Sequence, residues 1–478
     1  MLIEWGSSLP ELTEVASKLK ETGHDILYWV RNDSYSEVNK SLFPNTIFHD
    51  HIKAREGKPA LEFKLTKFDP VGSDVMSNFF ETESVFLFMI ERYYPEKTIQ
   101  EKKQLFFDLL TYWYGVIVKL KPEVVIFDQI PHHLHTHVVY AVIKFFNIKA
   151  IIINSTTLKD KLLITSDVKY NSPDLDSSLK KNLGKNFNLI DLDEELRNVL
   201  ETQTPLKLNS FQIVNEYHKQ KSKKNANTNF LFIKIKYWLK ILLSGRFLNL
   251  FYRYLKNRLI GNAKKEYLKF QTVPDFSSKF IYVPLHFQPE STTTVLGGIF
   301  ANQINLIEIL SASLPEGWKI YVKEHPVQFY SNGISYNPFR YKGYYERISS
   351  IKGVEIIPLN IESSKLIESC QLTATVTGTA AWESTLRLKP AFIFGDIWFQ
   401  SGPGIFKISN VQKCKEALAL IESGFKITKQ ELINYLFCLQ ESTVLGNLYL
   451  FFKPGSALDT TTNVNNIFKS VIRSMEKT

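Results

Sequence analysis

The chain has 478 residues, of which 44% are hydrophobic, 13% aromatic and 22% charged. This composition excludes a generally disordered protein, and the length suits two domains with an appendage because domains commonly span about 100–200 residues. Three widely spaced cysteines are too few for a disulfide framework or a zinc knuckle, and residues 1–5 lack the basic leader of a signal peptide, so we expect a cytoplasmic protein.

Residues 1–220 are predicted to form a first, Rossmann-like domain on the acceptor side of a cleft. The expected strands and helices of this domain are residues 2–5, 11–21, 25–30, 123–127, 137–146 and 150–153. Alternating strands and helices indicate a parallel sheet. Gly6 and Ser7 follow the first strand, so we assign both to the acceptor side.

Four of the ten histidines crowd the expected strand-to-helix loop that follows Asp128, namely His132, His133, His135 and His137. No cysteine or suitably spaced glutamate completes an obvious zinc set, so we predict no metal site and place the loop on the acceptor side. Asp128 lies just beyond a strand end and is a candidate general base for an acceptor hydroxyl, assisted by His132. The alternative for Asp128 is a turn or helix-capping role.

The net charge of +10 is concentrated in one segment. Residues 219–269 hold 14 Lys and Arg against one acid, which gives +13 and leaves −3 for the rest of the chain. We predict a basic amphipathic helical linker over residues 221–275, with a helix at 230–243. Its apolar face either contacts the anionic inner face of the membrane peripherally or packs between domains. Nucleic acid is not an expected partner, because no recognised module surrounds the basic stretch.

Residues 276–425 are predicted to form the second domain, which begins with a strand at 280–285. Gln288 and Glu290 follow that strand, and Glu290 is the one carboxylate between residues 275 and 308. An acid, base or nucleophile at this strand end would therefore be Glu290. The alternative is that Glu290 caps a helix that carries residues 300–310.

A second strand, at residues 319–323, ends in Lys323 and is followed by His325 and Pro326. The carboxyl ends of parallel strands are the edge where open α/β sheets bind ligands. An imidazole at His325 would donate a hydrogen bond to a departing phosphate, and Pro326 would stiffen the loop that positions it. The alternative is a structural histidine.

A third strand, at residues 372–376, leads through Thr377, Gly378 and Thr379 into a helix expected at 380–388. Such a turn aims backbone N–H groups and the positive end of the helix dipole at an anion. Thr379 could instead simply cap the helix. Glu383, one turn along, either accepts hydrogen bonds from ribose hydroxyls or pairs with Arg387.

Together these motifs resemble the donor half of bacterial capsule and surface-polysaccharide glycosyltransferases of the GT-B type, a group related to Kdo transferases and sialyltransferases. The matching residues are Gln288-Pro289-Glu290, Lys323-Glu324-His325-Pro326, Thr377-Gly378-Thr379 with Trp382-Glu383, and Lys389-Pro390-Ala391-Phe392-Ile393-Phe394-Gly395. The resemblance implies two Rossmann-like domains with parallel sheets facing an interdomain cleft. It also implies that the C-terminal helices, residues 426–478, pack back on the N-terminal domain.

The resemblance further implies a CMP-activated 2-keto-3-deoxy sugar, such as Kdo, sialic acid or another nonulosonate, used as co-substrate without a metal or other cofactor. His325 would contact the CMP phosphate, and residues 377–379 would hold phosphate or the donor carboxylate. Related Kdo transferases carry Gln-x-Asp where this chain has Gln288-Pro289-Glu290. The role of Glu290, and retention or inversion at the anomeric carbon, therefore stay open.

The predicted function is transfer of such a sugar to a hydroxyl of a polysaccharide or lipid-linked glycan. Two other classes stay in view. The first is a GT-B transferase or epimerase that uses UDP or another nucleotide sugar. The second is a non-catalytic protein that binds membrane or polysaccharide. Nucleotide preference separates the CMP-sugar transferase from the first of these classes. Any sugar transfer excludes the second.

Overall fold

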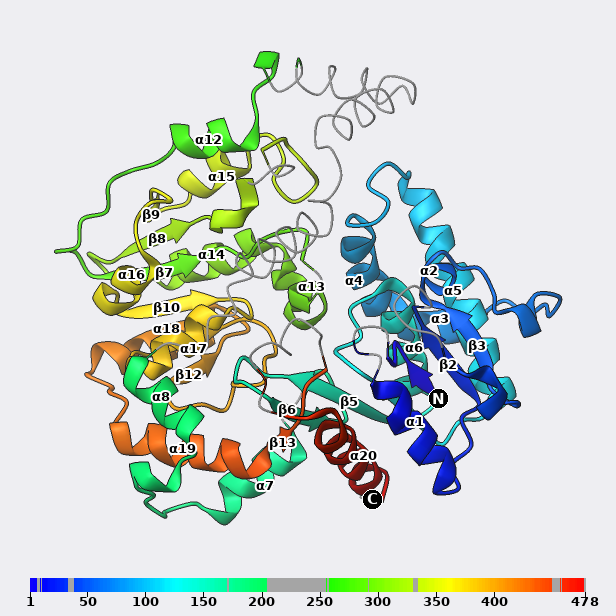
Figure 1. The fold of residues 1–478 in the computed structure, drawn as a ribbon. Coiled ribbons are helices and arrows are strands. Elements are labelled where there is room, and N and C mark those ends of the chain that lie inside the picture. The colour runs from blue at the N-terminus through cyan, green and yellow to red at the C-terminus, as the bar shows by residue number, and fades with distance from the viewer. Residues whose placement is uncertain are drawn as a thin grey trace, which may run out of the picture.

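The computed structural model describes residues 1–6, 9, 11–32, 38–169, 172–203, 255, 258–290, 292–329, 334–448, 456 and 458–476. Within these residues the chain is an α/β protein with two separate sheets, one in each half (Figure 1). Ser7, the predicted helix at 230–243 and most of the predicted linker lie outside the described residues.

The N-terminal sheet has seven strands in the order β13-β6-β5-β4-β1-β2-β3. Its strands are β1 (Leu2–Ile3), β2 (Tyr28–Arg31), β3 (Ile47–Asp50), β4 (Val124–Phe127), β5 (Lys149–Ser155), β6 (Lys161–Thr165) and β13 (Val444–Leu445). Strands β1 to β5 pair in parallel, whereas β6 and β13 pair antiparallel at one edge. The parallel part therefore has the doubly wound order 3-2-1-4-5.

The C-terminal sheet has six strands in the order β12-β11-β10-β7-β8-β9, all paired in parallel. Its strands are β7 (Phe280–Pro284), β8 (Lys319–Lys323), β9 (Val354–Ile356), β10 (Leu372–Thr375), β11 (Ala391–Ile393) and β12 (Ile405–Lys407). Counted within this domain, the order is again the doubly wound 3-2-1-4-5-6. Each half of the molecule is thus a Rossmann-like domain.

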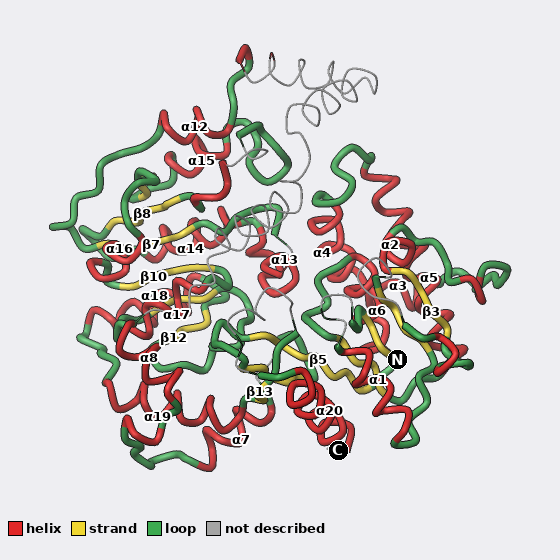
Figure 2. The backbone as a smooth tube through the Cα atoms, in the orientation of Figure 1, coloured by secondary structure: helices red, strands yellow, loops and turns green. Residues whose placement is uncertain are grey.

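Helices cover both faces of each sheet, as Figure 2 shows. Those of the N-terminal domain are α1 (Leu12–Glu21), α2 (His51–Arg55), α3 (Ser73–Met76), α4 (Phe80–Ile90), α5 (Ile99–Leu120) and α6 (Leu134–Phe145). Those of the C-terminal domain are α12 (Ala263–Lys269), α13 (Thr292–Gly297), α14 (Gln303–Ser313), α15 (Tyr344–Ser349), α16 (Ser363–Ser369), α17 (Thr379–Leu386) and α18 (Val411–Glu422). Short 3-10 turns lie at Lys40–Leu42, Leu61–Phe63, Ser77–Phe79, Leu189–Asp191, Gly298–Ala301 and Pro326–Phe329.

Alternate residues of the central strands enter different cores, because side chains of a strand point to opposite faces. In β4, Val125 and Phe127 join the core with α5 and α6, whereas Ile126 joins the core with α1 and α20 (Thr460–Glu476). Both faces of the sheet are apolar, as is typical of parallel strands covered by helices on both sides.

Four further helices complete the hydrophobic cores of the two domains. Helix α20 lies beside α1 (Figure 1), and its Val464, Ile467 and Val471 are buried in the N-terminal core. Helices α7 (Pro173–Lys181) and α8 (Glu194–Thr202) belong by sequence to the first half of the chain. They nevertheless share a hydrophobic core with α17 and α19 (Lys429–Ser442) of the second half. Residues 173–202 therefore depart from the expected N-terminal domain of residues 1–220.

Two predicted helix boundaries are wrong. The helix expected across 300–310 begins only at Gln303, because Gly298 has φ +51° and Asn302 caps α14 by accepting the Ile304 N–H. Helix α6 begins at Leu134 rather than at 137, so His135 and His137 lie in a helix and not in a loop. The backbone N–H of His133 donates to the Thr136 hydroxyl at this helix start.

Among the described residues, no single helix is long and apolar enough to span a membrane. The bent pair formed by residues 292–301 and 303–313 meets that test in length and composition. In this pair, Phe300, Ile304 and Ile307 are more than nine-tenths buried and pack in the core of the C-terminal domain.

Candidate active site

The strand orders define one switch point in each sheet, where a doubly wound sheet opens a crevice at its carboxyl edge. In the N-terminal sheet it lies between β1 and β4, which are followed by Glu4 and Asp128. In the C-terminal sheet it lies between β7 and β10, which are followed by His286 and Thr377. The side chains at these four positions are therefore the first to consider as site residues.

His286 ties the two strand ends of the C-terminal switch point together. Its Nε2 accepts the backbone N–H of Thr377 at 3.3 Å and lies 2.9 Å from Thr375 Oγ1, while Nδ1 lies 3.2 Å from Thr293 Oγ1. Burial lowers the pKa of His286 to about 4, so the imidazole is neutral at neutral pH. The sequence motifs did not single out His286, although its place two residues after a central strand was a usable signal.

The turn at residues 377–379 is packed against this imidazole. A side chain at Gly378 would place its Cβ 2.6 Å from Thr375 Oγ1 and 3.3 Å from a ring carbon of His286, so the close approach requires glycine. Gly378, not Thr379, is the N-cap residue of α17, and no side chain caps this helix. Thr379 is exposed at its first turn, whereas Thr377 is buried with its hydroxyl 3.2 Å from that of Thr293.

Glu290 caps the short helix α13. Its two carboxylate oxygens accept the backbone N–H groups of Thr292 at 2.8 Å and Thr293 at 2.6 Å. Burial opposes ionisation, but these hydrogen bonds hold the pKa of Glu290 below its usual range. Glu290 is therefore an ionised, weakly basic carboxylate, and the helix that it caps is α13 rather than the one predicted at 300–310.

A buried polar network supports the ends of β7 and β8. Arg340 and Glu324 form an ion pair with no exposed side-chain surface, with Arg340 Nε 2.6 Å from Glu324 Oε2. Arg340 also donates to Gln288 Oε1 at 2.8 Å and to the His286 carbonyl at 3.0 Å. Tyr345 donates its hydroxyl proton to Glu324 at 2.6 Å. The predicted donor-binding residue Gln288 is thus a buried member of this network.

The three residues predicted at the end of β8 point to different surroundings. Lys323 donates to the Ile361 carbonyl and to Ser363 Oγ at 3.2 Å, and burial lowers its pKa to about 8. His325 is half-buried, and its Nδ1 accepts the Val327 N–H at 3.2 Å, which leaves the proton on Nε2. Burial lowers the pKa of His325, so a neutral Nε2–H donor is expected here at neutral pH. Pro326 is exposed and begins a 3-10 turn.

Glu383 is half-buried in α17, and Arg387 donates to its backbone carbonyl at 3.1 Å. The side chain of Arg387 also lies 3.8 Å from the carboxylate of Glu368. The structure thus shows an ion pair between Arg387 and Glu368, and the ribose role of Glu383 stays a prediction.

At the N-terminal switch point, Asp128 is only 3% exposed. Burial, and after it the nearby charge of Glu4, raises the pKa of Asp128 well above its usual range. A carboxyl group that stays protonated is a poor base at neutral pH. Its burial therefore argues against the predicted general-base role.

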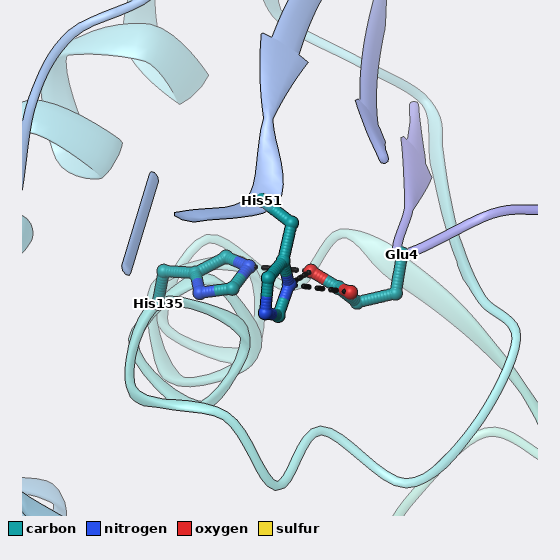
Figure 3. A group of neighbouring side chains, drawn as sticks. All are labelled: Glu4, His51 and His135. Carbon is teal, nitrogen blue, oxygen red and sulfur yellow. Dashed lines mark hydrogen bonds and ion pairs between the residues drawn. The ribbon is translucent and has the colours of Figure 1, made fainter. Parts of the chain in front are cut away.

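Glu4, which no sequence motif indicated, lies at the centre of a buried group with His51 and His135 (Figure 3). His51 Nδ1 lies 2.7 Å from each carboxylate oxygen of Glu4, and His135 Nε2 lies 2.6 Å from Oε1. Burial by itself would raise the pKa of Glu4, but the hydrogen bonds from His135 and His51 hold it well below its usual range. Glu4 is thus the ionised carboxylate of this switch point, beside a protonated Asp128.

A cavity of about 220 Å³ separates the two carboxyl edges and is lined from both domains. His132, Asn154 and Ser155 line it from the N-terminal side, and Thr292 and Thr379 from the C-terminal side. Burial lowers the pKa of His132 to about 4, and the charge of Glu290 opposes that shift. The cavity therefore brings together two residues predicted from sequence, His132 and Thr379, and the charge of Glu290 acts on this histidine.

Gly6 and Ser7 were predicted on the acceptor side, and of these two residues only Gly6 is described. Gly6 has φ +76°, a backbone conformation that favours glycine, in the turn that leads from β1 toward α1. It is buried and lies two residues after Glu4.

Two Rossmann-like domains whose carboxyl edges share one cavity are the arrangement of GT-B-like α/β proteins, as the sequence predicted. No protein family model and no curated protein matches the chain. Solved structures similar to it include two modules of KpsC from Thermosulfurimonas dismutans. The β-Kdo 2,7 transferase has 10% identity and TM-score 0.30 over 80% of this chain and 96% of that chain. The β-Kdo 2,4 transferase has 12% identity and TM-score 0.33 over 74% and 87%.

A further similar structure is the UDP-GlcNAc 2-epimerase from Neisseria meningitidis, with 12% identity and TM-score 0.25 over 99% of both chains. At these identities and TM-scores the similarities carry no argument about activity. The fold class rests on the strand order of the two sheets and on the cavity between them.

Proposed function

We propose that the protein is a glycosyltransferase that moves a 2-keto-3-deoxy sugar from its CMP-activated form to a hydroxyl of a surface glycan. The observation that carries this proposal is a cavity between the described parts of the two domains, lined by residues that follow strands of both sheets. Such a cavity lets a donor held by one sheet meet an acceptor held by the other. The nucleotide and the sugar class rest on the motif resemblance.

The C-terminal edge supplies donors for the leaving phosphate. The neutral His325 offers an Nε2–H group, and the N-terminus of α17 adds its dipole and the exposed Thr379 hydroxyl. Donors fixed before the reaction stabilise charge that develops on the leaving group. This supports a role for His325 and the 377–379 turn in binding the CMP phosphate.

The carboxylates at this edge support a donor that needs no metal. Among the described residues after β7 and β8, Glu290 is engaged by backbone N–H groups and Glu324 by Arg340. Both carboxylates therefore already accept hydrogen bonds from fixed groups of the protein. A monophosphate-linked donor such as a CMP-sugar fits this arrangement.

For the acceptor, we propose His132 as the base in place of Asp128. As the bond from the acceptor oxygen to the anomeric carbon forms and the bond from that carbon to the phosphate breaks, the hydroxyl proton passes to the neutral His132 ring. CMP leaves with the bonding electron pair. The imidazolium then lies opposite the ionised Glu290, whose charge stabilises it.

Calorimetric titration of the full-length protein with CMP and with UDP, each with and without magnesium, tests the proposal. We expect CMP to bind selectively and without magnesium, His325→Ala to lose that binding, and His24→Ala to keep it. His24 is a suitable control because it is partly exposed in a groove beside α20, away from the cavity. Preference for UDP would contradict the donor class, and binding of neither nucleotide would contradict the transferase proposal.

A further inference from the structure

Three side chains from separate elements converge behind the N-terminal switch point (Figure 3). Glu4 directly follows β1, His51 is the first residue of α2, and His135 lies in the first turn of α6. The ligand atoms that they offer, one carboxylate oxygen and two imidazole nitrogens, lie within 4.8 Å of one another. The exposed fractions are 3% for Glu4, 8% for His51 and 0% for His135.

We propose that Glu4, His51 and His135 form a binding site for a divalent cation of the zinc class. Two imidazoles and a carboxylate are a ligand set that zinc uses, and zinc with three protein ligands keeps a fourth position for water or substrate. Magnesium and calcium prefer oxygen ligands, so two nitrogens among three donors select against them. This proposal does not depend on the proposed sugar transfer.

The distances between the ligand atoms show how far they must move to bind zinc. Glu4 Oε1 lies 2.7 Å from His51 Nδ1 and 2.6 Å from His135 Nε2, which are hydrogen-bond distances. Ligands around tetrahedral zinc stand about 3.3 Å apart, given bonds of about 2.0–2.2 Å. Binding therefore moves each imidazole back from the carboxylate by about half an ångström. The proton of His51 is then carried on Nε2 and that of His135 on Nδ1.

Two observations around the group favour a cation. Glu4 has φ +61°, a left-handed conformation that costs a non-glycine residue energy and recurs at functional sites. Asp128 Oδ1 is buried without a hydrogen-bond partner among the described residues, and the Glu4 charge acts on it. The nearby cation Arg55 lies over the Tyr93 ring, 4.6 Å from its centroid. A bound dication would offset the charge of the Glu4 carboxylate directly.

Zinc titration of the full-length protein tests the proposal. The protein is freed of affinity tag and metal, then titrated with zinc chloride against a chromophoric chelator, and bound zinc is counted after desalting. We expect one zinc per chain. His51→Ala and His135→Ala should each weaken binding by more than the roughly 10–100-fold that losing an outer-shell partner costs. His24→Ala should leave binding unchanged.

Cobalt substitution of the unmodified protein gives a second measurement, which stands even if the alanine variants fold poorly. Cobalt bound by two imidazoles and a carboxylate is expected to give visible d–d absorption bands that zinc displaces. The absence of these bands would overturn the proposal. Zinc binding that is equal in the natural protein and in the His51→Ala/His135→Ala double variant would also overturn it. Glu4 would then be only the shared acceptor of two imidazole N–H groups.

Discussion

The polar side chains at the carboxyl edges of the two sheets have different kinds of hydrogen-bond partners. At the C-terminal edge, His286 and Glu290 are held by backbone N–H groups, and Glu324 is paired with Arg340. At the N-terminal edge, the carboxylate of Glu4 is hydrogen-bonded to the imidazoles of His51 and His135, and Asp128 is buried nearby. The first edge is a rigid frame with a few outward donors, and the second is a cluster whose charge responds to protons or cations.

The two edges therefore suit different kinds of chemistry. A frame fixed by backbone hydrogen bonds suits an anion that must be bound the same way each time, such as a nucleotide phosphate. A cluster of imidazoles and carboxyls suits proton transfer or metal binding.

The largest expected effect is on stability, from the Glu324–Arg340 pair. Arg340→Met leaves the Glu324 carboxylate buried without its partner, and breaking a buried pair in this way costs about 3–5 kcal/mol. Urea unfolding of the variant measures the loss. Arg347→Met is the matched control, because its pair with Glu308 is about half exposed and should change stability little. Equal midpoints for the two variants would show that the network does not hold the edge together.

A pH dependence is expected from His286. Its pKa is about 4 in the folded protein and about 6.5 when unfolded, so the unfolded chain binds the proton more tightly. Its contribution to stability is therefore fully present above about pH 6.5 and is lost as the pH falls toward about 4, by about 3 kcal/mol. Urea unfolding at several pH values measures this slope. His286→Gln should flatten it by that amount, and an unchanged slope would contradict a neutral, buried imidazole.

Turnover should depend on His325 if the fixed edge binds the leaving phosphate. His325→Ala removes the Nε2–H donor and should lower kcat by on the order of 10²-fold, or about 2.7 kcal/mol in activation free energy. His325→Gln keeps an N–H donor and should recover part of the loss. CMP release in the presence of donor and acceptor is the measurement. Near-normal turnover in His325→Ala would remove this residue from the site.

The smallest expected effect is on the cap that Glu290 provides. Glu290→Ala leaves two N–H groups at the start of α13 without their acceptor and should cost about 1 kcal/mol of stability. Thermal unfolding detects a loss of this size. Comparing its turnover with that of His132→Gln sharpens the assignment. If Glu290→Ala abolishes turnover while His132→Gln does not, Glu290 belongs among the reacting groups and the base assigned to His132 is wrong.

Local sequence pattern was enough for the frame of both domains. Apolar runs such as 280–285 and 319–323 predicted β7 and β8, because a central parallel strand is buried on both faces and needs no distant information to be recognised. Helix boundaries were harder to predict where a single residue ends or begins the helix. Gly298 and Asn302 ended one helix and began another inside a stretch that reads as continuous helix.

Local pattern could not find contacts between distant residues. Glu4 lies 47 residues from His51 and 131 residues from His135, so no spacing rule connects them. Each of the three residues alone is unremarkable in sequence. Likewise α7 and α8 follow the first domain in sequence but pack with α17 and α19, because their apolar faces complete a core that the second half provides.

By itself, the sequence determined which residues follow the strands of each sheet, and hence the candidates Glu290, His325 and the 377–379 turn. Strand order determined the rest, because it decides which strand ends are neighbours. It placed Glu4 beside Asp128, buried Asp128 so that its pKa is raised, and brought His132 within reach of the charge of Glu290. Burial and electrostatic interactions depend on neighbours in space, so only the tertiary structure could decide which of these groups carry charge.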